Sequence, residues 1–345
     1  MRFGAGWLDA SGAATMAGMT QYDDAILDSN SVSPTDKEGR PIPVTIPVAL
    51  APGVKVVYTT RLGGVSAGGY ANCNMGGKSG DSPSAVLANR EALSRAIGAP
   101  LSLICQVHSG TAVDIDPIFE TNAPFGFDAS GTQGAAMHPT VIEADAQVTG
   151  RTGIALGMFA ADCLPVLMAD PITGVIGAAH CGRLGLQRGV IGSTVELMRS
   201  KGADPSRIVA TLGPAICGDC YETGDQIADE FDAQFPGTFR LTRFGGPGVD
   251  LSAAALAELA AAGIPADNVI PSRARVAAAT QYLSEDAELT ELCESDGEGG
   301  SLPERLAELR RGMCTLENPL WYSHRRASLA GQGNEGRMLA LIVRA

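Results

Sequence analysis

The chain has 345 residues, of which 45% are hydrophobic and 18% are charged. This composition predicts a globular protein with a sizeable core and excludes a disordered chain. The formal net charge of −13 argues against a nucleic-acid partner, because a phosphate backbone binds a basic surface, whereas a few local arginines suffice to hold a small anion.

The N-terminal part predicts few regular elements. Residues 1–54 predict an N-terminal extension that is partly irregular, with one strand near 44–50. The β-branched and aromatic run at 54–60 predicts a strand. Ser82, followed by proline, predicts the start of a helix, and Gly98 predicts its end.

The middle of the chain is rich in predicted strands. Short strands are expected at 103–107, from Thr111 onward, at 144–148 and at 153–161. Residues 117–140 are rich in Gly, Pro, Asn and Ser and predict a long surface loop. Residues 164–179 predict a β-hairpin, and residues 184–201 predict a helix.

The C-terminal third mixes both kinds of element. A strand is expected at 208–212, helices at 224–235 and 250–263, and a buried strand at 337–343. Residues 284–300 carry seven carboxylates and no basic residue, which predicts a solvated loop. Because strands and helices mix without regular βαβ alternation, we predict one α+β domain and not a doubly wound fold.

The predicted hairpin brings two reactive side chains together. With a four-residue loop from Asp170 to Thr173, its register pairs Cys163 directly with His180. Directly opposed residues hold their Cβ atoms about 4.5–5.5 Å apart on one face of the sheet. A thiol and an imidazole at that distance either form a nucleophile pair or share a metal ion.

A second histidine extends the metal hypothesis. His108 ends a predicted strand, and together with Cys163 and His180 it supplies two imidazoles and one thiolate. Three protein ligands with an open fourth position are typical of catalytic zinc, which lowers the pKa of bound water to about 7. The alternative is a buried cysteine and two unrelated core histidines, because no local spacing brings His108 to the other two.

Other cysteines and arginines give weaker signals. Cys217 and Cys220 form a CxxC pair that no second pair or nearby histidine completes, so we expect a structural role. Cys181 follows His180 on a strand and should point to the opposite face. Four arginines at element ends are candidates for an anion site, with ordinary surface charge as the alternative. They are Arg61, Arg183, Arg325 and Arg326.

A series of motifs carries a resemblance to a known family. In chain order they are Tyr58–Ser66, Asn74–Gly76, Gly80–Asp81, Asn89–Arg90, Gln106–His108, Ala144–Ala146, Ala161–Val166, Ala178–His180, Leu212–Ile216, Cys220–Glu222, Cys314–Thr315 and Gly336–Met338. Together they resemble the YfiH family, also called the multicopper polyphenol oxidoreductase or laccase-domain family. The resemblance runs in order from about residue 55 to the C-terminus.

The resemblance implies a fold, a metal site and a reaction. It implies a single layered domain over 55–345, with a mixed β-sheet flanked by helices, a fold shared with deamidating toxins that use a Cys–His pair. It also implies a zinc or copper site formed by His108, Cys163 and His180. It implies phosphorolysis of adenosine, inosine and 5′-methylthioadenosine to the base and ribose 1-phosphate, with adenosine deamination as a second activity. Asp162 is then expected to carry a proton. Nucleoside and phosphate are expected at Arg61, Asn74, Arg183 and Arg325.

The chain departs from the family pattern beside the second histidine. The usual Ala-Gly-Trp-Arg-Gly is replaced by Cys181, Gly182, Arg183, Leu184 and Gly185. The three metal ligands are retained, so the departure bears on the nucleoside pocket alone.

Three other functions stay open. One is a metal-free cysteine hydrolase acting on an amide, with Cys163 as nucleophile and His180 as base, in which His108 is dispensable. Another is a copper-dependent polyphenol oxidoreductase, since two histidines and a cysteine also form copper sites. The last is a metal-binding regulator without catalysis.

The sequence also bears on compartment and assembly. The N-terminus lacks a basic segment followed by an apolar run, so we expect no signal peptide. The most apolar stretch, 153–169, is interrupted by Asp162 and is too short to span a bilayer. We therefore expect a cytoplasmic monomer or homodimer with mostly reduced thiols and no membrane partner.

Overall fold

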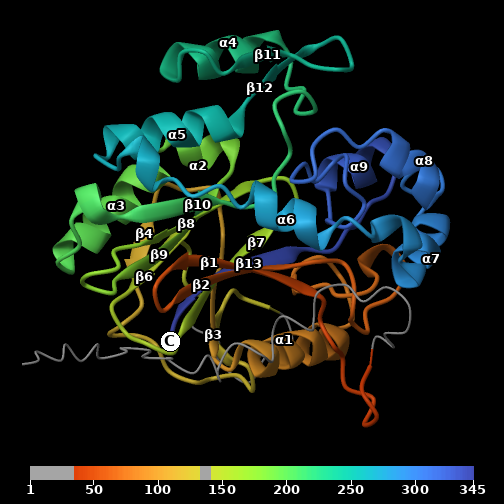
Figure 1. Cartoon of the computed structure of the whole chain (residues 1–345), viewed down its shortest axis with the longest axis horizontal. Helices are drawn as coiled ribbons and strands as arrows, with labels where there is room; N and C mark the ends of the chain where they lie inside the picture. The colour runs from red at the N-terminus through yellow and green to blue at the C-terminus, as the bar shows by residue number, and fades with distance from the viewer. Residues whose placement is uncertain (1–34, 133–140) are drawn as a thin grey trace, which may run out of the picture.

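Two β-sheets stack face to face at the centre of the computed structural model, which describes residues 35–132 and 141–345 (Figure 1). The larger sheet has the strand order β1-β2-β13-β7-β3-β5, and the smaller has the order β10-β8-β9-β6-β4. Both contain parallel and antiparallel neighbours, for example β3 beside β5 and β8 beside β9. The predicted layered fold with mixed sheets is therefore confirmed.

The strands have the following bounds. The larger sheet contains β1 (Thr45–Ala51), β2 (Val54–Thr59), β3 (Leu101–Ile104), β5 (Gly126–Ala129), β7 (Ala155–Ala160) and β13 (Met338–Arg344). The smaller sheet contains β4 (Ala112–Asp114), β6 (Ala146–Thr149), β8 (Leu164–Ala169), β9 (Ile176–Cys181) and β10 (Val209–Leu212). A separate hairpin pairs β11 (Phe239–Leu241) with β12 (Pro247–Val249).

Helices cover the outer faces of both sheets. The helix α1 (Pro83–Ile97) lies below the larger sheet in Figure 1 and packs its apolar face there. The smaller sheet is covered by α2 (Arg183–Gln187), α3 (Val190–Ser200) and α5 (Leu251–Ala261). The remaining helices are α4 (Asp225–Gln234), α6 (Arg273–Ala279), α7 (Ala287–Ser295), α8 (Leu302–Ala307) and α9 (His324–Leu329).

The core has three apolar layers, and the β2 strand contributes to two of them. Successive strand side chains point to opposite faces of a sheet. Val56 and Tyr58 accordingly pack between the two sheets, whereas Val57 packs toward α1. Every residue of β2 except Lys55 is buried, so both faces of this strand contribute to the core.

Some predicted elements are present as expected, and others differ from the observed ones. The strand expected near 44–50 is present as β1, and it adds an edge strand to the larger sheet. The helix expected at 184–201 is two helices, because Gly189 has a φ of 72°. The loop expected at 117–140 contains β5, and its residues 133–140 lie outside the described part of the chain.

The acidic segment 284–300 is not the solvated loop that its composition predicts. Residues Ala287–Ser295 form α7, and the Asp286 carboxylate caps this helix by accepting a hydrogen bond from the backbone N–H of Leu289 (2.8 Å). The side chains of Asp296 and Glu298 are only 2% and 4% exposed. Buried carboxylates require partners, and the partners here are arginines distant in sequence.

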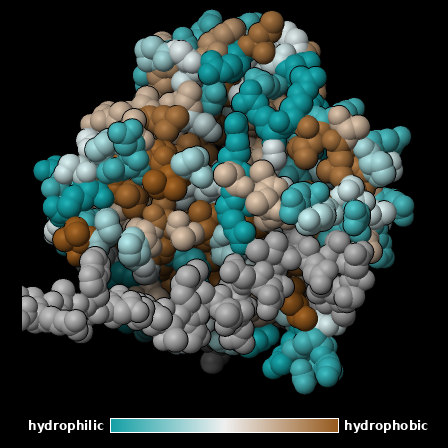
Figure 2. Space-filling model, in the orientation of Figure 1, coloured by the Kyte–Doolittle hydropathy of each residue, from teal (hydrophilic) through white to brown (hydrophobic). Residues whose placement is uncertain are grey.

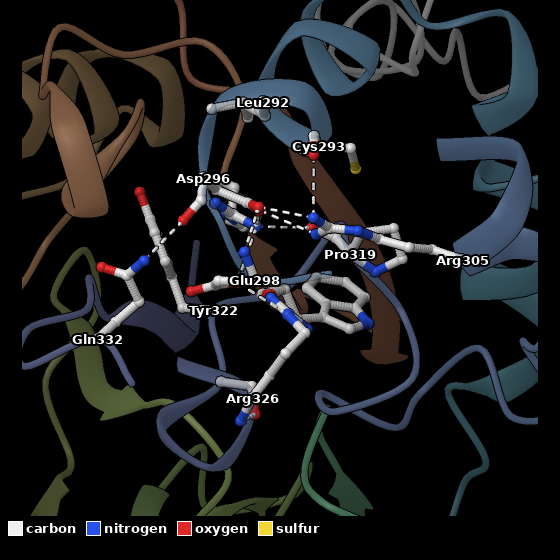
Figure 3. A network of polar contacts seen from close by, with 12 residues as sticks. Leu292, Cys293, Asp296, Glu298, Arg305, Pro319, Tyr322, Arg326 and Gln332 are labelled. Carbon is white, nitrogen blue, oxygen red and sulfur yellow. Dashed lines mark hydrogen bonds and ion pairs between the residues drawn. The ribbon is translucent and has the colours of Figure 1, made fainter. Parts of the chain in front are cut away.

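Three arginines neutralise these two carboxylates (Figure 3). Asp296 accepts hydrogen bonds from Arg61 (3.0 Å) and a bidentate pair from Arg305 (2.9 and 2.6 Å). Glu298 accepts a bond from the Nε of Arg326 (2.8 Å) and also lies 3.5 Å from Arg61. The segment is therefore held to the core by charge-assisted hydrogen bonds rather than by apolar contacts alone.

The surface of the molecule mixes polar and apolar side chains (Figure 2). Apolar residues gather over the region of α5, where Leu256 is 45% exposed. Among the described residues, no helix is both long and apolar enough to cross a membrane.

Replacing Arg61 by methionine is expected to lower the free energy of unfolding by about 3 kcal/mol, because Asp296 and Glu298 would keep buried charge with one partner fewer. Chemical denaturation measures this loss. Arg199→Met is the matched control, because its ion pair with Glu196 is solvent-exposed and should contribute less than about 1 kcal/mol. Equal losses for the two variants would contradict the role given to the buried network.

Candidate functional site

Three side chains singled out in the sequence meet in one cavity of about 640 Å³. His108 comes from the loop after β3, Cys163 directly precedes β8, and His180 lies within β9. Their potential ligand atoms all lie within 4.8 Å of one another. The Cys163 Sγ is 3.6 Å from the His108 Nε2, and the two imidazole centroids are 4.9 Å apart. The structure thus shows that His108 lies beside Cys163 and His180, which the sequence spacing alone did not predict.

The register of the hairpin differs from the predicted one. The four-residue loop runs from Pro171 to Gly174, one residue later than expected, because Gly174 adopts a left-handed φ of 72°. His180 is therefore opposite Pro165 instead of Cys163. The pairing is displaced by two residues, and an even displacement keeps side chains on the same face. Cys163 and His180 consequently remain neighbours, on a diagonal.

The backbone is unusual at two positions of the site. His108 has a φ of 58° and Asp162, which precedes Cys163, has a φ of 98°. They are the only non-glycine residues with positive φ in the described part of the chain. Such conformations cost free energy and cluster at functional sites, where surrounding contacts hold them.

Asp145 holds both histidines in place, a role that sequence reasoning missed. Its Oδ1 is 2.8 Å from the Nδ1 of His180 and accepts a bond from the backbone N–H of His108 (3.0 Å). Its Oδ2 accepts bonds from the backbone N–H and the hydroxyl of Ser109 (2.5 and 2.7 Å). Burial would raise the pKa of Asp145, but these hydrogen bonds outweigh it and lower the pKa to about 2.

Interactions with the two histidines favour the thiolate form of Cys163. Burial would raise the pKa of its thiol, but the charge of His180 and a hydrogen bond with His108 lower it to about 6. Burial would likewise lower the pKa of His180, but Cys163 and Asp145 raise it to about 9. The thiolate is the form of cysteine that binds a metal ion or attacks as a nucleophile.

Gly182 has no side chain, and this leaves room for the side chains of His108 and Cys163. A Cβ atom at this position would lie 2.8 Å from the Cδ2 of His108 and 2.9 Å from the Sγ of Cys163. Both distances are too short for any real side chain. The glycine two residues after His180 is therefore required by this close approach.

Asp162 does not present a free carboxylate to the cavity. Its Oδ1 accepts a hydrogen bond from the Thr315 hydroxyl (2.6 Å), and its Oδ2 accepts one from the backbone N–H of Arg325 (2.6 Å). Burial raises the pKa of this carboxyl above its usual value. Because both oxygens are engaged, the geometry favours positioning of the α9 segment over the expected proton transfer.

Of the four residues expected to bind nucleoside and phosphate, only Arg325 lines the cavity. Arg61 is fully buried in the ion-pair network with Asp296 and Glu298. Asn74 is also buried, and its amide organises the turn at Gly76. Arg183 lies outside the lining and donates a hydrogen bond to the Gln187 side chain (2.7 Å).

Two cationic residues that sequence reasoning did not single out line the same cavity. They are Lys78 and Arg337. Together with Arg325 they give the lining three positive side chains, whereas the Asp162 carboxylate in the same lining is already hydrogen-bonded. The Lys78 ammonium lies 2.8 Å from the Cys105 sulfur, and Arg337 pairs with Glu335. No local pattern in the sequence brings these residues together.

Two aromatic rings complete the lining. The Tyr221 ring lies under the Arg325 guanidinium, with 5.4 Å between the guanidinium carbon and the ring centroid. The backbone of Phe159 is fixed by two hydrogen bonds with the Gln106 amide (2.7 and 2.9 Å). The cavity thus combines a metal-ligand group, cationic side chains and aromatic faces.

The three other cysteines considered in the sequence, Cys181, Cys217 and Cys220, do not line this cavity. Cys181 is fully buried in the apolar layer next to α3 and α5, as the alternation along β9 predicts. Cys217 and Cys220 do not line the cavity. The sequence offered no second CxxC pair or nearby histidine beside them, and in the folded chain Cys314 and Glu317 lie next to this pair.

Proteins named purine nucleoside phosphorylase and adenosine deaminase are similar to this chain. Purine nucleoside phosphorylase ORF3 of Streptomyces griseus is 44% identical over 210 residues, which are 60% of this chain and 79% of that protein. Purine nucleoside phosphorylase SCO2081 of Streptomyces coelicolor is 40% identical, with coverages of 61% and 82%. A protein named adenosine deaminase RL5, from an unknown prokaryotic organism, is 33% identical, with coverages of 64% and 83%.

Solved structures and a family model show the fold and the family. The crystal structure of NMB0706 from Neisseria meningitidis has a TM-score of 0.62 and 28% identity, covering 88% of this chain and 98% of that one. YlmD from Geobacillus stearothermophilus also has a TM-score of 0.62 and 28% identity, with coverages of 85% and 92%. Residues 55–345 match the family described as multi-copper polyphenol oxidoreductase laccase. The chain therefore belongs to this family, to which the YfiH proteins give their name.

Proposed function

We propose that this chain is a metal-dependent purine nucleoside phosphorylase. It would convert adenosine, inosine or 5′-methylthioadenosine and phosphate into the free base and ribose 1-phosphate. The observation that carries the proposal is that a His-Cys-His group and three cationic side chains line a single cavity. The relatives named purine nucleoside phosphorylase support the reaction class. The relative named adenosine deaminase supports deamination as a second activity.

The donor set of His108, Cys163 and His180 fits zinc. Two imidazole nitrogens and one thiolate are common zinc ligands, and three protein ligands leave a fourth position for substrate or water. Copper accepts the same donors, so copper is the second candidate ion. A bound ion supplies Lewis acidity at this end of the cavity. Asp145 would orient His180 by accepting its Nδ1–H, which leaves Nε2 for the ion.

The cationic side chains would bind phosphate. Arg325 uses one nitrogen to donate to the backbone carbonyl of Glu222 (2.8 Å), which fixes the guanidinium while other donors of its fork stay available. Lys78 and Arg337 add positive charge to the same lining. A phosphate oxygen would form a bond to C1′ of the ribose while the bond from C1′ to the purine nitrogen breaks. The aromatic faces of Phe159 and Tyr221 suit a purine base.

One observation favours a second candidate function, a metal-free cysteine hydrolase. Cys163, His180 and Asp145 form a chain in which the acid lies 2.8 Å from the histidine, and the pKa of the thiol is lowered. A nucleophile, a base and an orienting acid in that order are typical of cysteine hydrolases. His108 would have no role in such an enzyme, so its replacement separates the two functions.

Replacing His108 by alanine is expected to remove the metal ion bound at this site, because two ligands hold an ion much more weakly than three. Metal analysis of protein purified without added metal should show one ion per chain fewer than in the unmodified protein. His324→Ala is the matched control, since His324 lines the cavity but is not in the ligand group. Unchanged occupancy together with retained amidase activity in His108→Ala would favour the cysteine hydrolase.

Replacing Asp145 by asparagine is expected to weaken metal binding by about 10- to 100-fold, which is typical when a carboxylate partner of a ligating histidine is lost. The side chain keeps its size, so the fold should persist. Competition with a chromophoric chelator measures the affinity. An unchanged affinity would show that the contact between Asp145 and His180 does not support the ligand.

Release of hypoxanthine from inosine is expected to require phosphate and to yield ribose 1-phosphate. Arg325→Gln should raise the KM for phosphate by about 10- to 100-fold, because a hydrogen bond to a charged group contributes about 1.5–3 kcal/mol. Arg199→Gln, which changes a solvent-exposed arginine of α3 that does not line the cavity, is the control and should leave this KM nearly unchanged. Equal rates with and without phosphate would identify a hydrolase instead.

A further inference from the structure

A second group of potential metal ligands lies outside the cavity of the His-Cys-His site. It consists of Cys217, Cys220, Cys314 and Glu317, whose sulfur and carboxylate oxygen atoms all lie within 4.8 Å of one another. Three of these residues are buried and Cys217 is partly buried. None of the four lines the cavity assigned to the proposed reaction. The group therefore needs an explanation that the proposed function does not provide.

The side chains of this group are already oriented toward one another. The Cys220 thiol lies 3.3 Å from the Oε1 of Glu317, and the Cys314 sulfur accepts a bond from the backbone N–H of Cys217 (3.4 Å). The other carboxylate oxygen, Oε2 of Glu317, accepts bonds from the backbone N–H groups of Arg310 (3.0 Å) and Arg311 (2.8 Å). Backbone donors thus fix two of the four groups, as outer contacts do in metal sites.

We propose that Cys217, Cys220, Cys314 and Glu317 bind one zinc ion as a closed structural site. Three thiolates and one carboxylate provide four zinc ligands, and four protein ligands in a tetrahedron are the mark of structural zinc. A Zn–S bond of about 2.3 Å places the sulfurs of a tetrahedron about 3.8 Å apart, which the observed mutual limit of 4.8 Å accommodates with small rotations. This site is distinct from the His-Cys-His group.

The ion would join a segment that lines the proposed catalytic cavity to a second segment that supports it from behind. Ala215 and Cys314 form a parallel bridge, so the segments 215–220 and 314–317 already run side by side. The first segment leads into the cavity-lining residues Ile216 and Tyr221. The second carries Thr315, whose hydroxyl bonds to Asp162 beside the ligand Cys163. A zinc ion would therefore stabilise the cavity without contacting substrate.

Access and charge are both consistent with an ion at this position. A small cavity of about 200 Å³ is lined by Cys217 and Cys314, which gives an entry path. The Arg243 guanidinium lies 3.5 Å from the Oε1 of Glu317. Arg311 lines the same small cavity. These cations would offset part of the negative charge of three thiolates and a carboxylate around one divalent ion.

The test uses full-length protein in which Cys163 is replaced by alanine, so that the His-Cys-His site no longer contributes metal. Purified in reducing buffer with zinc and then dialysed, Cys163→Ala is expected to retain one zinc ion per chain. Adding Cys314→Ala should abolish it, and adding Cys181→Ala, which removes a buried cysteine outside both groups, should not. Substitution by cobalt should give thiolate-to-metal charge-transfer absorption in Cys163→Ala that Cys314→Ala removes.

A milder variant keeps the test decisive if Cys314→Ala fails to fold. Glu317→Gln preserves side-chain size and all three thiols, and in the Cys163→Ala background it is expected to release zinc to a chelator at least tenfold faster. The proposal would be overturned by a Cys163→Ala protein without zinc, or by equal zinc in the presence and absence of Cys314. A disulfide among the three cysteines in protein purified under reducing conditions would also overturn it. None of these outcomes depends on phosphorylase activity.

Discussion

The positions of the two histidines in the candidate site depend on the carboxylate of Asp145. It contacts His180 through the ring and receives backbone hydrogen bonds from the loop that carries His108. One side chain thereby fixes a ligand from each sheet, since His108 follows a strand of the larger sheet and His180 belongs to the smaller. A buried carboxylate with this many donors is strongly favoured in its charged form, and so it maintains the geometry near neutral pH.

The stacking of the two sheets explains why the site is a cavity rather than a surface patch. Apolar residues fill the space between the sheets, and the polar groups gather at the edge where the strands end. Cys163 enters this edge through the left-handed turn at Asp162, and Gly182 leaves it room. Residues of the site thus adopt locally unfavourable backbone conformations, and tertiary contacts offset the free-energy cost.

The sequence predicted local features well and distant contacts poorly. Periodicity, caps and turn residues located α1, the hairpin and β13 close to their observed bounds. The hairpin register was displaced, yet the pairing of faces survived because the displacement was even. The acidic segment and Arg61 were misjudged for one reason. Arg61 was expected to bind phosphate and the acidic segment to be solvated, and only the folded chain shows that they pair with each other.

The buried network around Arg61 has a consequence for exchanging segments between members of the family. The acidic segment supplies the negative charges that pair with three guanidinium groups. One belongs to Arg61, just after β2 of the larger sheet, and the others belong to Arg305 and Arg326 in the C-terminal region. A chimera that replaced residues 284–300 with a short neutral connection would leave those guanidinium groups enclosed without anions. The segment and its three arginines therefore form one transferable unit, and a graft that divides them would fail in folding before any question of catalysis arose.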